Sequence, residues 1–328
     1  MLLHDLRALL TSRKLFNNWL SAGIKYYLIK RGIIGGDIAI RYGSRKFVLK
    51  PKEYSFIVNA FYDGALKEVH SGSSGELLGR LCGVIDLVVT ARGGILRMPD
   101  GVLLALESSK LGVIAETWLH DIHFLGFDLS GWFVLDVGAF AGDTALYYAR
   151  RGAFVVAVEP VPGNFELMLR NLELNPDLKS RVLPINAAVG GKDGFVELSC
   201  EAPVDGGASV YGPGRLKFRV RSVRLSTLLK EIERMGVDLN SFKVRALKMD
   251  CKGCEYDVIK EVDALKLFDV IKIEYSGYLR NKTYRELEEA LERLGYRCRV
   301  WAHNERVLRI GLDKHGMLTC MRSCEAVR

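Results

Sequence analysis

The chain of 328 residues contains no glutamine, although lysine, arginine and glutamate are abundant. This bias is reported for heat-adapted proteins. No apolar run reaches the roughly 18 residues that cross a bilayer, and the first residues lack the charged start and unbroken apolar stretch of a signal peptide. A hydrophobic content of 49% with 26% charged residues is typical of a folded globular protein. We therefore expect a cytoplasmic protein with no transmembrane segment.

Seven cysteines are an odd number in a chain of this length, which excludes the disulfide framework of a small secreted domain. Cys251 and Cys254 form a CxxC pair, and Cys320 and Cys324 form a second, looser pair. Four thiolates can bind zinc, but the first pair lies in a turn that we assign to catalysis. We expect no metal site and interpret these cysteines as small buried residues. A metal or redox role is the less favoured alternative.

The net charge of +8 permits an acidic partner. Residues 1–32 carry apolar side chains at helical spacing, among them Trp19, Ile24 and Tyr27, together with lysine and arginine. A basic amphipathic helix can pack on its own domain, make peripheral contact with a membrane or bind nucleic acid. We favour packing on the domain. The early basic residues are Arg13, Lys14, Lys25, Lys30, Arg31, Arg41, Arg45, Lys46, Lys50 and Lys52.

Strand-like and helix-like segments alternate from Trp132 onward. This rhythm predicts a Rossmann-like, doubly wound α/β sheet that is mostly parallel, with an antiparallel strand at one edge. We expect this domain to cover residues 94–328 and to follow an α+β accessory region, 1–93, built from the basic helix and hairpins. A ligand of such a sheet lies beyond the carboxyl ends of its strands. The strands are expected at 132–137, 154–158, 182–188, 246–249, 270–274, 296–302 and 317–321, with a β-rich insertion between 195 and 223.

The turn after the first of these strands has the layout of a nucleotide-binding unit but lacks two of its glycines. A dinucleotide fingerprint requires Gly-x-Gly-x-x-Gly so that phosphate can approach the backbone. Only Gly138 fits that pattern, because Phe140 and Asp143 occupy the second and third glycine positions. The carboxylate of Asp143 disfavours phosphate, and its alternative role is that of a plain helix cap.

Glu159 ends the second strand about twenty residues beyond Gly138, where an acid that accepts ribose hydroxyls is expected. A ribose acceptor combined with an acidic turn suits S-adenosylmethionine, whose sulfonium and ammonium groups are positively charged. We expect Asp136, Gly138 and Asp143 to shape the methionine end of the site. The candidate cofactor-binding residues are Asp136, Gly138, Ala139, Gly142, Asp143, Thr144, Glu159, Pro160, Asn186 and Ala187.

These segments together resemble the FkbM family of S-adenosylmethionine-dependent methyltransferases, over roughly residues 94–322. The resemblance implies a class I methyltransferase fold with S-adenosylmethionine as cofactor. One position departs from the family pattern Asp-x-Glu-Gly-x-Glu, because Lys252 replaces the first glutamate while Asp250, Gly253 and Glu255 remain. The motifs that carry the resemblance are VLDVGAFAGDT at 134–144, AVEP at 157–160, NLELN at 171–175, NAAVG at 186–190, LKMDCKGCE at 247–255 and IKIEY at 271–275.

The turn after the fourth strand lacks the Asp/Asn-Pro-Pro-aromatic sequence that enzymes methylating base or amide nitrogens commonly share. This absence favours an oxygen acceptor, such as a hydroxyl of a sugar, glycolipid or other small metabolite. Such an acceptor needs a group that takes its proton. The candidates are Asp250, Glu255 and Glu274, which lie at or near neighbouring strand ends. Glu255 has an alternative role as a first-turn helix acid.

Three histidines, His120, His123 and His303, could reach the same cleft, although a lone histidine is more often structural. Two other functions stay open at this point. One is an RNA-directed methyltransferase that uses the basic N-terminal region to grip its substrate. The other is a cofactor-binding protein whose catalysis is impaired, which the replacement at Lys252 suggests.

Overall fold

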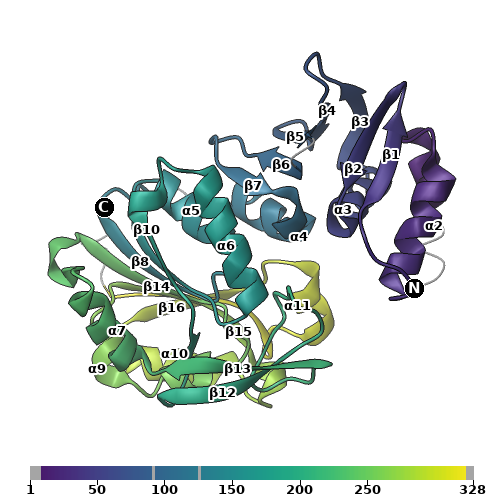
Figure 1. The fold of residues 1–328 in the computed structure, drawn as a ribbon. Helices are drawn as coiled ribbons and strands as arrows, with labels where there is room; N and C mark the ends of the chain where they lie inside the picture. The colour runs from purple at the N-terminus through teal and green to yellow at the C-terminus, as the bar shows by residue number, and fades with distance from the viewer. Residues whose placement is uncertain (1–8, 91–92, 125–126, 323–328) are drawn as a thin grey trace. The chain divides into compact units, whose positions relative to one another are not determined.

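A computed structural model describes residues 9–90, 93–124 and 127–322 (Figure 1). The chain divides into two compact units, Met1–His120 and Asp121–Arg328. Across the described residues, no helix combines the length and the apolar character that crossing a membrane requires. Cys324 lies outside the described residues.

Among its described residues, the first unit contains three α-helices, a hairpin and an antiparallel sheet of five strands in sequence order. One of the hairpins expected in this region is formed by residues 38–49, and its turn includes Gly43 at a φ of +59°. Helix α3 begins with Pro51 at its first turn, where the missing N–H costs nothing. The elements are α2 (Trp19–Lys30), β1 (Ile38–Tyr42), β2 (Arg45–Leu49), α3 (Pro51–Tyr62), β3 (Leu66–Ser71), β4 (Leu77–Leu81), β5 (Ile85–Thr90), β6 (Gly93–Arg97), β7 (Leu103–Ala105) and α4 (Leu111–Ile114).

Helix α2 buries only part of the apolar stripe that we expected to pack on its own domain. Its buried residues are the small Ala22 and Gly23. Leu20, Ile24 and Tyr27 are 50%, 49% and 41% exposed. Ile24 and Tyr27 of the predicted stripe therefore face solvent, contrary to expectation, whereas Trp19 and Leu28 are partly buried.

The division between the units differs from the expected boundary at residue 93. Strand β6 begins at Gly93 and pairs antiparallel with β5, and β7 pairs with β6. These strands complete the sheet of the first unit, so residues 94–120 belong with it. A sequence pattern cannot show this, because the partners of an antiparallel strand are set by tertiary pairing.

The second unit contains the expected α/β sheet, whose strands follow the order β10-β9-β8-β14-β15-β17-β16. All neighbouring pairs are parallel except those of β17, which runs antiparallel between β15 and β16. The last two strands thus pair antiparallel as expected, although the outermost strand is β16. The strands are β8 (Trp132–Val137), β9 (Phe154–Val158), β10 (Val182–Ile185), β14 (Val244–Met249), β15 (Val270–Ser276), β16 (Arg297–Trp301) and β17 (His315–Met321).

Helices cover both faces of this sheet (Figure 1). The central strands are buried on both faces, as is usual for parallel sheets; β8, for example, is buried at every residue, including Asp136. Leu135, Val156, Leu247 and Ile271 from four neighbouring strands belong to one core cluster. The helices are α5 (Asp143–Arg150), α6 (Pro162–Leu174), α7 (Leu225–Arg234), α8 (Glu255–Val258), α9 (Val262–Leu265), α10 (Tyr284–Glu292) and α11 (Glu305–Ile310).

A small three-stranded sheet forms the insertion between the third and fourth strands of the main sheet. Its order is β11-β13-β12, with β12 and β13 paired as a long antiparallel ribbon. The β-rich insertion predicted between 195 and 223 is therefore confirmed. Its strands are β11 (Ala188–Val189), β12 (Gly194–Cys200) and β13 (Leu216–Val223).

Candidate functional site

A cavity of about 650 Å³ lies beyond the carboxyl ends of β8, β9 and β14 and extends along the insertion sheet. The strand order reverses direction at β8, and open α/β sheets bind ligands at such a switch point. The volume lies within the usual range for small-molecule sites. Five of the residues predicted to act at the site line this cavity: Gly138, Glu159, Pro160, Ala187 and Asp250.

The turn after β8 is held against its neighbours by its backbone. The N–H groups of Gly138 and Ala139 donate to the carbonyl of Val158, at 2.9 and 3.1 Å. Gly138 has a φ of +82°, and a Cβ added there would lie 2.1 Å from the carbonyl oxygen of Asp250. A side chain at Gly138 would thus collide with the turn after β14.

Glu159 is 4% exposed and its carboxylate organises the loops around the cavity. Oε2 accepts from the N–H of Phe140 at 2.9 Å, and Oε1 accepts from Val161 N–H and Asn164 Nδ2 at 2.8 and 3.0 Å. Burial raises the pKa of this carboxyl to about 7, although the three hydrogen bonds act in the opposite direction. Since each carboxylate oxygen has two lone pairs, Oε2 keeps one for a ligand hydroxyl.

Asp136 lies beneath the turn and does not reach the cavity. It is fully buried, with Lys248 Nζ 2.9 Å from Oδ1 and Thr144 Oγ1 donating to Oδ2 at 2.5 Å. Burial lowers the pKa of Lys248, but the carboxylates of Asp136 and Asp250 outweigh this effect and raise it. Asp136 and Thr144 therefore stabilise the turn after β8 without lining the cavity. A buried ammonium in this strand was not predicted, because the ion pair of Lys248 with Asp136 depends on the pairing of β14 with β8.

The other predicted cofactor residues surround the turn without lining the cavity. Asp143 begins α5, as a first-turn acid favoured by the helix dipole. Gly142 has a φ of +76°, and a Cβ there would lie 2.7 Å from Met168 Cγ. Ala139 is buried, and Asn186 is exposed, with its Nδ2 donating to the carbonyl of Glu159 at 2.7 Å. Asn186 thus positions the Glu159 backbone.

The turn after β14 places Asp250 at the cavity, next to a buried ammonium. Lys252 Nζ donates to Asp250 Oδ1 and, at 3.1 Å, to Glu274 Oε1. Burial opposes the charge on Lys252, but the two carboxylates outweigh burial and raise its pKa far above the ordinary value. Lys252 is therefore a fixed cation between Asp250, which lines the cavity, and Glu274, which does not.

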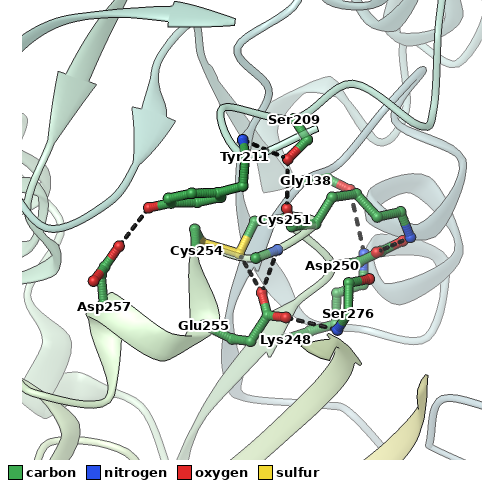
Figure 2. Close-up of a disulfide and its surroundings, with 12 residues drawn as sticks. Gly138, Ser209, Tyr211, Lys248, Asp250, Cys251, Cys254, Glu255, Asp257 and Ser276 are labelled. Carbon is green, nitrogen blue, oxygen red and sulfur yellow. Dashed lines mark hydrogen bonds and ion pairs between the residues drawn. A yellow bond between two sulfur atoms is a disulfide. The ribbon is translucent and has the colours of Figure 1, made fainter. Parts of the chain in front are cut away.

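Glu255 links the turn after β14 to the end of β15 through hydrogen bonds of its side chain. Its side chain is fully buried, and its oxygens accept from the N–H groups of Gly253 at 2.8 Å and Ser276 at 2.7 Å (Figure 2). Burial raises the pKa of Glu255 to about 7, against the lowering effect of these hydrogen bonds. This arrangement favours a structural role at the start of α8 over a role as the catalytic base.

Tyr211, which the sequence analysis did not identify, connects the insertion to the turn after β14 and to α8. Its hydroxyl donates to Asp257 Oδ2 (Figure 2), and its ring stacks under the guanidinium of Arg280 at 4.1 Å. A Cβ at Gly253 would lie 2.6 Å from the Tyr211 ring. Ser209 adds a hydrogen bond to the carbonyl of Lys252 at 2.7 Å. The glycine at 253 therefore permits the insertion to cover the turn.

Among the described residues, two disulfides replace the unbonded cysteines that we expected. Cys251 is joined to Cys254 in the wall of the cavity, and Cys298 is joined to Cys320 across β16 and β17. A cysteine sulfur that is joined in a disulfide carries no proton and cannot bind a metal as a thiolate.

The lining of the cavity is acidic. Among its residues, five carboxylates face two lysines, which gives a formal net charge of −3 when all five carboxyl groups, including Glu159, are ionised. A cationic ligand is favoured in such a site and a phosphate is disfavoured. The charged lining residues are Glu159, Glu197, Asp205, Asp250, Asp257, Lys192 and Lys252.

The three candidate histidines do not line the cavity. His120 is exposed and ends the first unit. His123 packs edge-on against Tyr148, and its carbonyl accepts from Lys272. His303 lies 3.8 Å from Glu274, on the far side of Lys252 from the cavity residue Asp250.

Comparison with known proteins finds a family model and curated proteins that are similar to this chain. Residues 136–298 match the family model described as the methyltransferase FkbM domain. Methyltransferase 1 of Beauveria bassiana (strain ARSEF 2860) is 26% identical over 147 residues, which cover 40% of this chain and 58% of that protein. Methyltransferase sdnD of Sordaria araneosa is 28% identical over 158 residues, covering 40% and 60%. The chain thus spans less than two thirds of these curated relatives.

Among solved structures, methyltransferase FkbM from Methylobacillus flagellatus KT is similar at 17% identity and a TM-score of 0.40. That similarity covers 63% of this chain and 47% of the other chain.

Proposed function

The chain belongs to the FkbM methyltransferase family through residues 136–298, and on this premise we propose that it transfers a methyl group from S-adenosylmethionine to a hydroxyl of a small molecule or glycan. The observation that carries the proposal is the placement of Glu159 and Asp250 in one acidic cavity at the switch point of the sheet. Glu159 serves the cofactor and Asp250 serves the acceptor.

The residues around the cavity fit S-adenosylmethionine. Glu159 Oε2 keeps a lone pair for a ribose hydroxyl, and Ala187 offers an apolar surface for the adenine. The net charge of −3 on the lining complements a sulfonium and an ammonium group. When bound, the cofactor supplies an electrophilic methyl group. Aligning the acceptor with that group is then the main task of the protein.

Asp250 is the residue that we assign to the acceptor. Its side chain is 25% exposed, and Lys252 occupies Oδ1. Oδ2 is left to accept the hydrogen bond of a hydroxyl and then its proton as the oxygen–carbon bond forms. The ammonium of Lys252 holds the carboxylate in place, so the replacement that departs from the family pattern positions Asp250. Glu274, on the other side of Lys252, is a positioning residue in this assignment.

The acidic cavity weighs against an RNA acceptor, because phosphates would have to approach a lining with a net charge of −3. The basic residues of the first unit are the one feature that favours RNA. The second alternative, a cofactor-binding protein without catalysis, predicts that Asp250 is inert.

A methyl-transfer assay distinguishes these functions. The full chain is incubated with S-adenosylmethionine labelled in its methyl group and with separate panels of sugars, lipid head groups and tRNA. We expect label in hydroxyl-bearing small molecules or glycans. Label in tRNA would establish the RNA-directed function, and cofactor binding with no transfer to any panel would favour the impaired protein.

A further inference from the structure

Three potential metal ligands meet at one side of the main sheet, outside the cavity described above. Glu274 lies near the end of β15, His315 begins the neighbouring β17, and His303 follows β16. His303 Nε2 is 3.8 Å from Glu274 Oε2, and His315 Nε2 is 3.9 Å from Glu274 Oε1. One ligand atom from each of the three residues lies within 4.8 Å of the other two.

The histidine nitrogens in this cluster lack the partners that buried polar atoms normally have. Both histidine side chains are fully buried. Among the described residues, neither ring nitrogen of His303 has a hydrogen-bond partner, and neither does Nε2 of His315. A native protein rarely leaves such atoms unsatisfied, and an ion is one of the regular explanations.

The orientation of His315 is that of a metal ligand. Its Nδ1 lies 2.9 Å from the carbonyl of Tyr275. A carbonyl only accepts, so Nδ1 carries the proton and Nε2 presents a bare lone pair toward Glu274. Metal-bound histidines are held in the same way, with the second nitrogen donating to a backbone carbonyl or carboxylate.

The charges around the cluster favour the binding of a cation. Lys252 lies between Asp250 and Glu274, so one ammonium faces two carboxylates, and the two histidines are neutral donors in their metal-binding form. The group carries a net charge of −1. Lys252 occupies one lone pair of Glu274 Oε1, while Oε2 faces His303.

We propose that Glu274, His303 and His315 bind a divalent transition-metal ion such as Zn²⁺. Two imidazole nitrogens and one carboxylate form a donor set that binds Zn²⁺ and Fe²⁺ in other proteins. Zinc–ligand distances of about 2.0 to 2.1 Å place ligand atoms roughly 3.4 Å apart in a tetrahedron. The separations of 3.8 and 3.9 Å therefore have to close by less than about 1 Å.

No sequence motif predicts this site, because its ligands come from three separate segments and only Glu274 lies in one of the motifs, at 271–275. The CxxC pair, which is the visible metal-binding pattern, is joined in a disulfide. Glu255 beside it already accepts two backbone hydrogen bonds. The inference is also independent of the proposed methyl transfer, since a chain that binds metal but transfers no methyl group leaves it intact.

The test is a titration of the chelator-treated full chain with Co²⁺ and with Zn²⁺. We expect one equivalent of Co²⁺ to bind with ligand-field absorption and without the intense sulfur-to-cobalt band of a thiolate site. Zn²⁺ should raise the unfolding temperature. His303→Ala and His315→Ala should each weaken Co²⁺ binding by about a hundredfold or more.

Two controls separate this site from other donors. His70→Ala removes an exposed histidine of the first unit, and the double variant Cys251→Ser/Cys254→Ser removes the only other cluster of potential ligands found among the described residues. Both should bind Co²⁺ as the unaltered chain does. If a histidine variant does not fold, Glu274→Gln and the Co²⁺ spectrum of the unaltered chain remain decisive. No uptake by the unaltered chain, a sulfur-to-cobalt band, or unchanged binding in the folded histidine or Glu274→Gln variants would overturn the proposal.

Discussion

Glu159 should make cofactor binding depend on pH. Its carboxyl has a pKa of about 7 because it is buried, so the protonated form dominates at pH 6. Ribose hydroxyls need the ionised form as an acceptor, and binding should therefore weaken as the pH falls. We expect affinity for S-adenosylmethionine to be about tenfold lower at pH 6 than at pH 8.

Isothermal titration calorimetry across this pH range checks the prediction. Glu159→Gln keeps the shape and one acceptor oxygen but does not titrate, so it provides the control for ionisation of the cofactor itself. Its affinity should lack the part of the pH dependence that belongs to Glu159. Glu159→Ala should weaken binding by about 1.5 to 3 kcal/mol. Equal pH profiles for the unaltered chain and Glu159→Gln would remove Glu159 from the site.

Asp250→Asn should separate turnover from cofactor binding. The amide keeps the volume and a hydrogen bond but cannot take a proton, so turnover should fall by roughly 10² to 10⁴ while cofactor affinity stays the same. Glu197→Gln is a matched control, because Glu197 lines the cavity but lies on β12 and pairs with Lys217. We expect it to change turnover less than about twofold. Full turnover in Asp250→Asn would exclude the assigned role.

The positions of Glu159 and Asp250 could be predicted because each follows a recognisable strand, and the carboxyl ends of parallel strands share one edge. The roles of their neighbours could not. Lys252 bridges carboxylates that are separated by 24 residues in sequence, and Tyr211 meets Asp257 across 46 residues. Such contacts depend on tertiary placement of a turn and an insertion that no local pattern specifies.

At the scale of elements, the approach of the β8 turn to the β14 turn depends on Gly138. Gly138→Ala combines a positive φ with a Cβ that would lie 2.1 Å from the Asp250 carbonyl oxygen. We expect it to lower the free energy of unfolding by about 2 to 4 kcal/mol. Gly236→Ala is the control, since Gly236 has a φ of +92° but no atom within 4 Å of the added Cβ.

Chemical denaturation of both variants measures the difference. Gly236→Ala should cost only about 1 kcal/mol, the strain of the left-handed conformation alone. Equal losses in the two variants would mean that the β14 turn moves away readily and that the close approach does not constrain it.

Helix α2 should bind anionic membranes peripherally. Leu20, Ile24 and Tyr27 recur at positions i, i+4 and i+7, so they form one exposed apolar face, and Lys25 and Lys30 lie on the same helix. Sedimentation with phosphatidylserine-containing vesicles measures this contact. Leu20→Ser/Ile24→Ser should reduce binding about tenfold or more.

Leu308→Ser provides the control for this measurement, because Leu308 is 79% exposed but belongs to the second unit. It should leave vesicle binding unchanged. The membrane assignment fails if the α2 variant and the Leu308 variant behave alike.

Most elements of the second unit follow from hydrophobic patterning, since buried parallel strands appear as continuous apolar runs. The predicted strand 270–274 ends two residues before β15 does, and the predicted strand 317–321 begins two residues after β17 does. Helix α11 was missed, although Asn304 caps it by accepting from the N–H groups of Arg306 and Val307. A helix of six residues is too short to show a reliable period. The burial expected for Ile24 and Tyr27 of α2 was wrong, because an apolar stripe alone does not specify which of its side chains meet a partner.

At the scale of the whole molecule, the division into two units predicts which truncated chains fold. A chain that starts at Asp121 keeps the complete main sheet, whereas one that starts at Gly94 carries β6 and β7 without β5. Unpaired strand edges promote aggregation. We expect the shorter chain to be monomeric and to unfold cooperatively in calorimetry, and the longer one to aggregate. The opposite behaviour would restore the boundary at residue 93.

The central claim is that the cavity at the ends of β8, β9 and β14 binds S-adenosylmethionine beside Asp250. Diffraction from crystals of the full chain grown with S-adenosylhomocysteine tests it most directly. We predict that the ribose hydroxyls contact the Glu159 carboxylate and that the sulfur faces the side of the cavity that Asp250 lines. A product bound elsewhere on the chain, or with its ribose away from Glu159, would contradict this account.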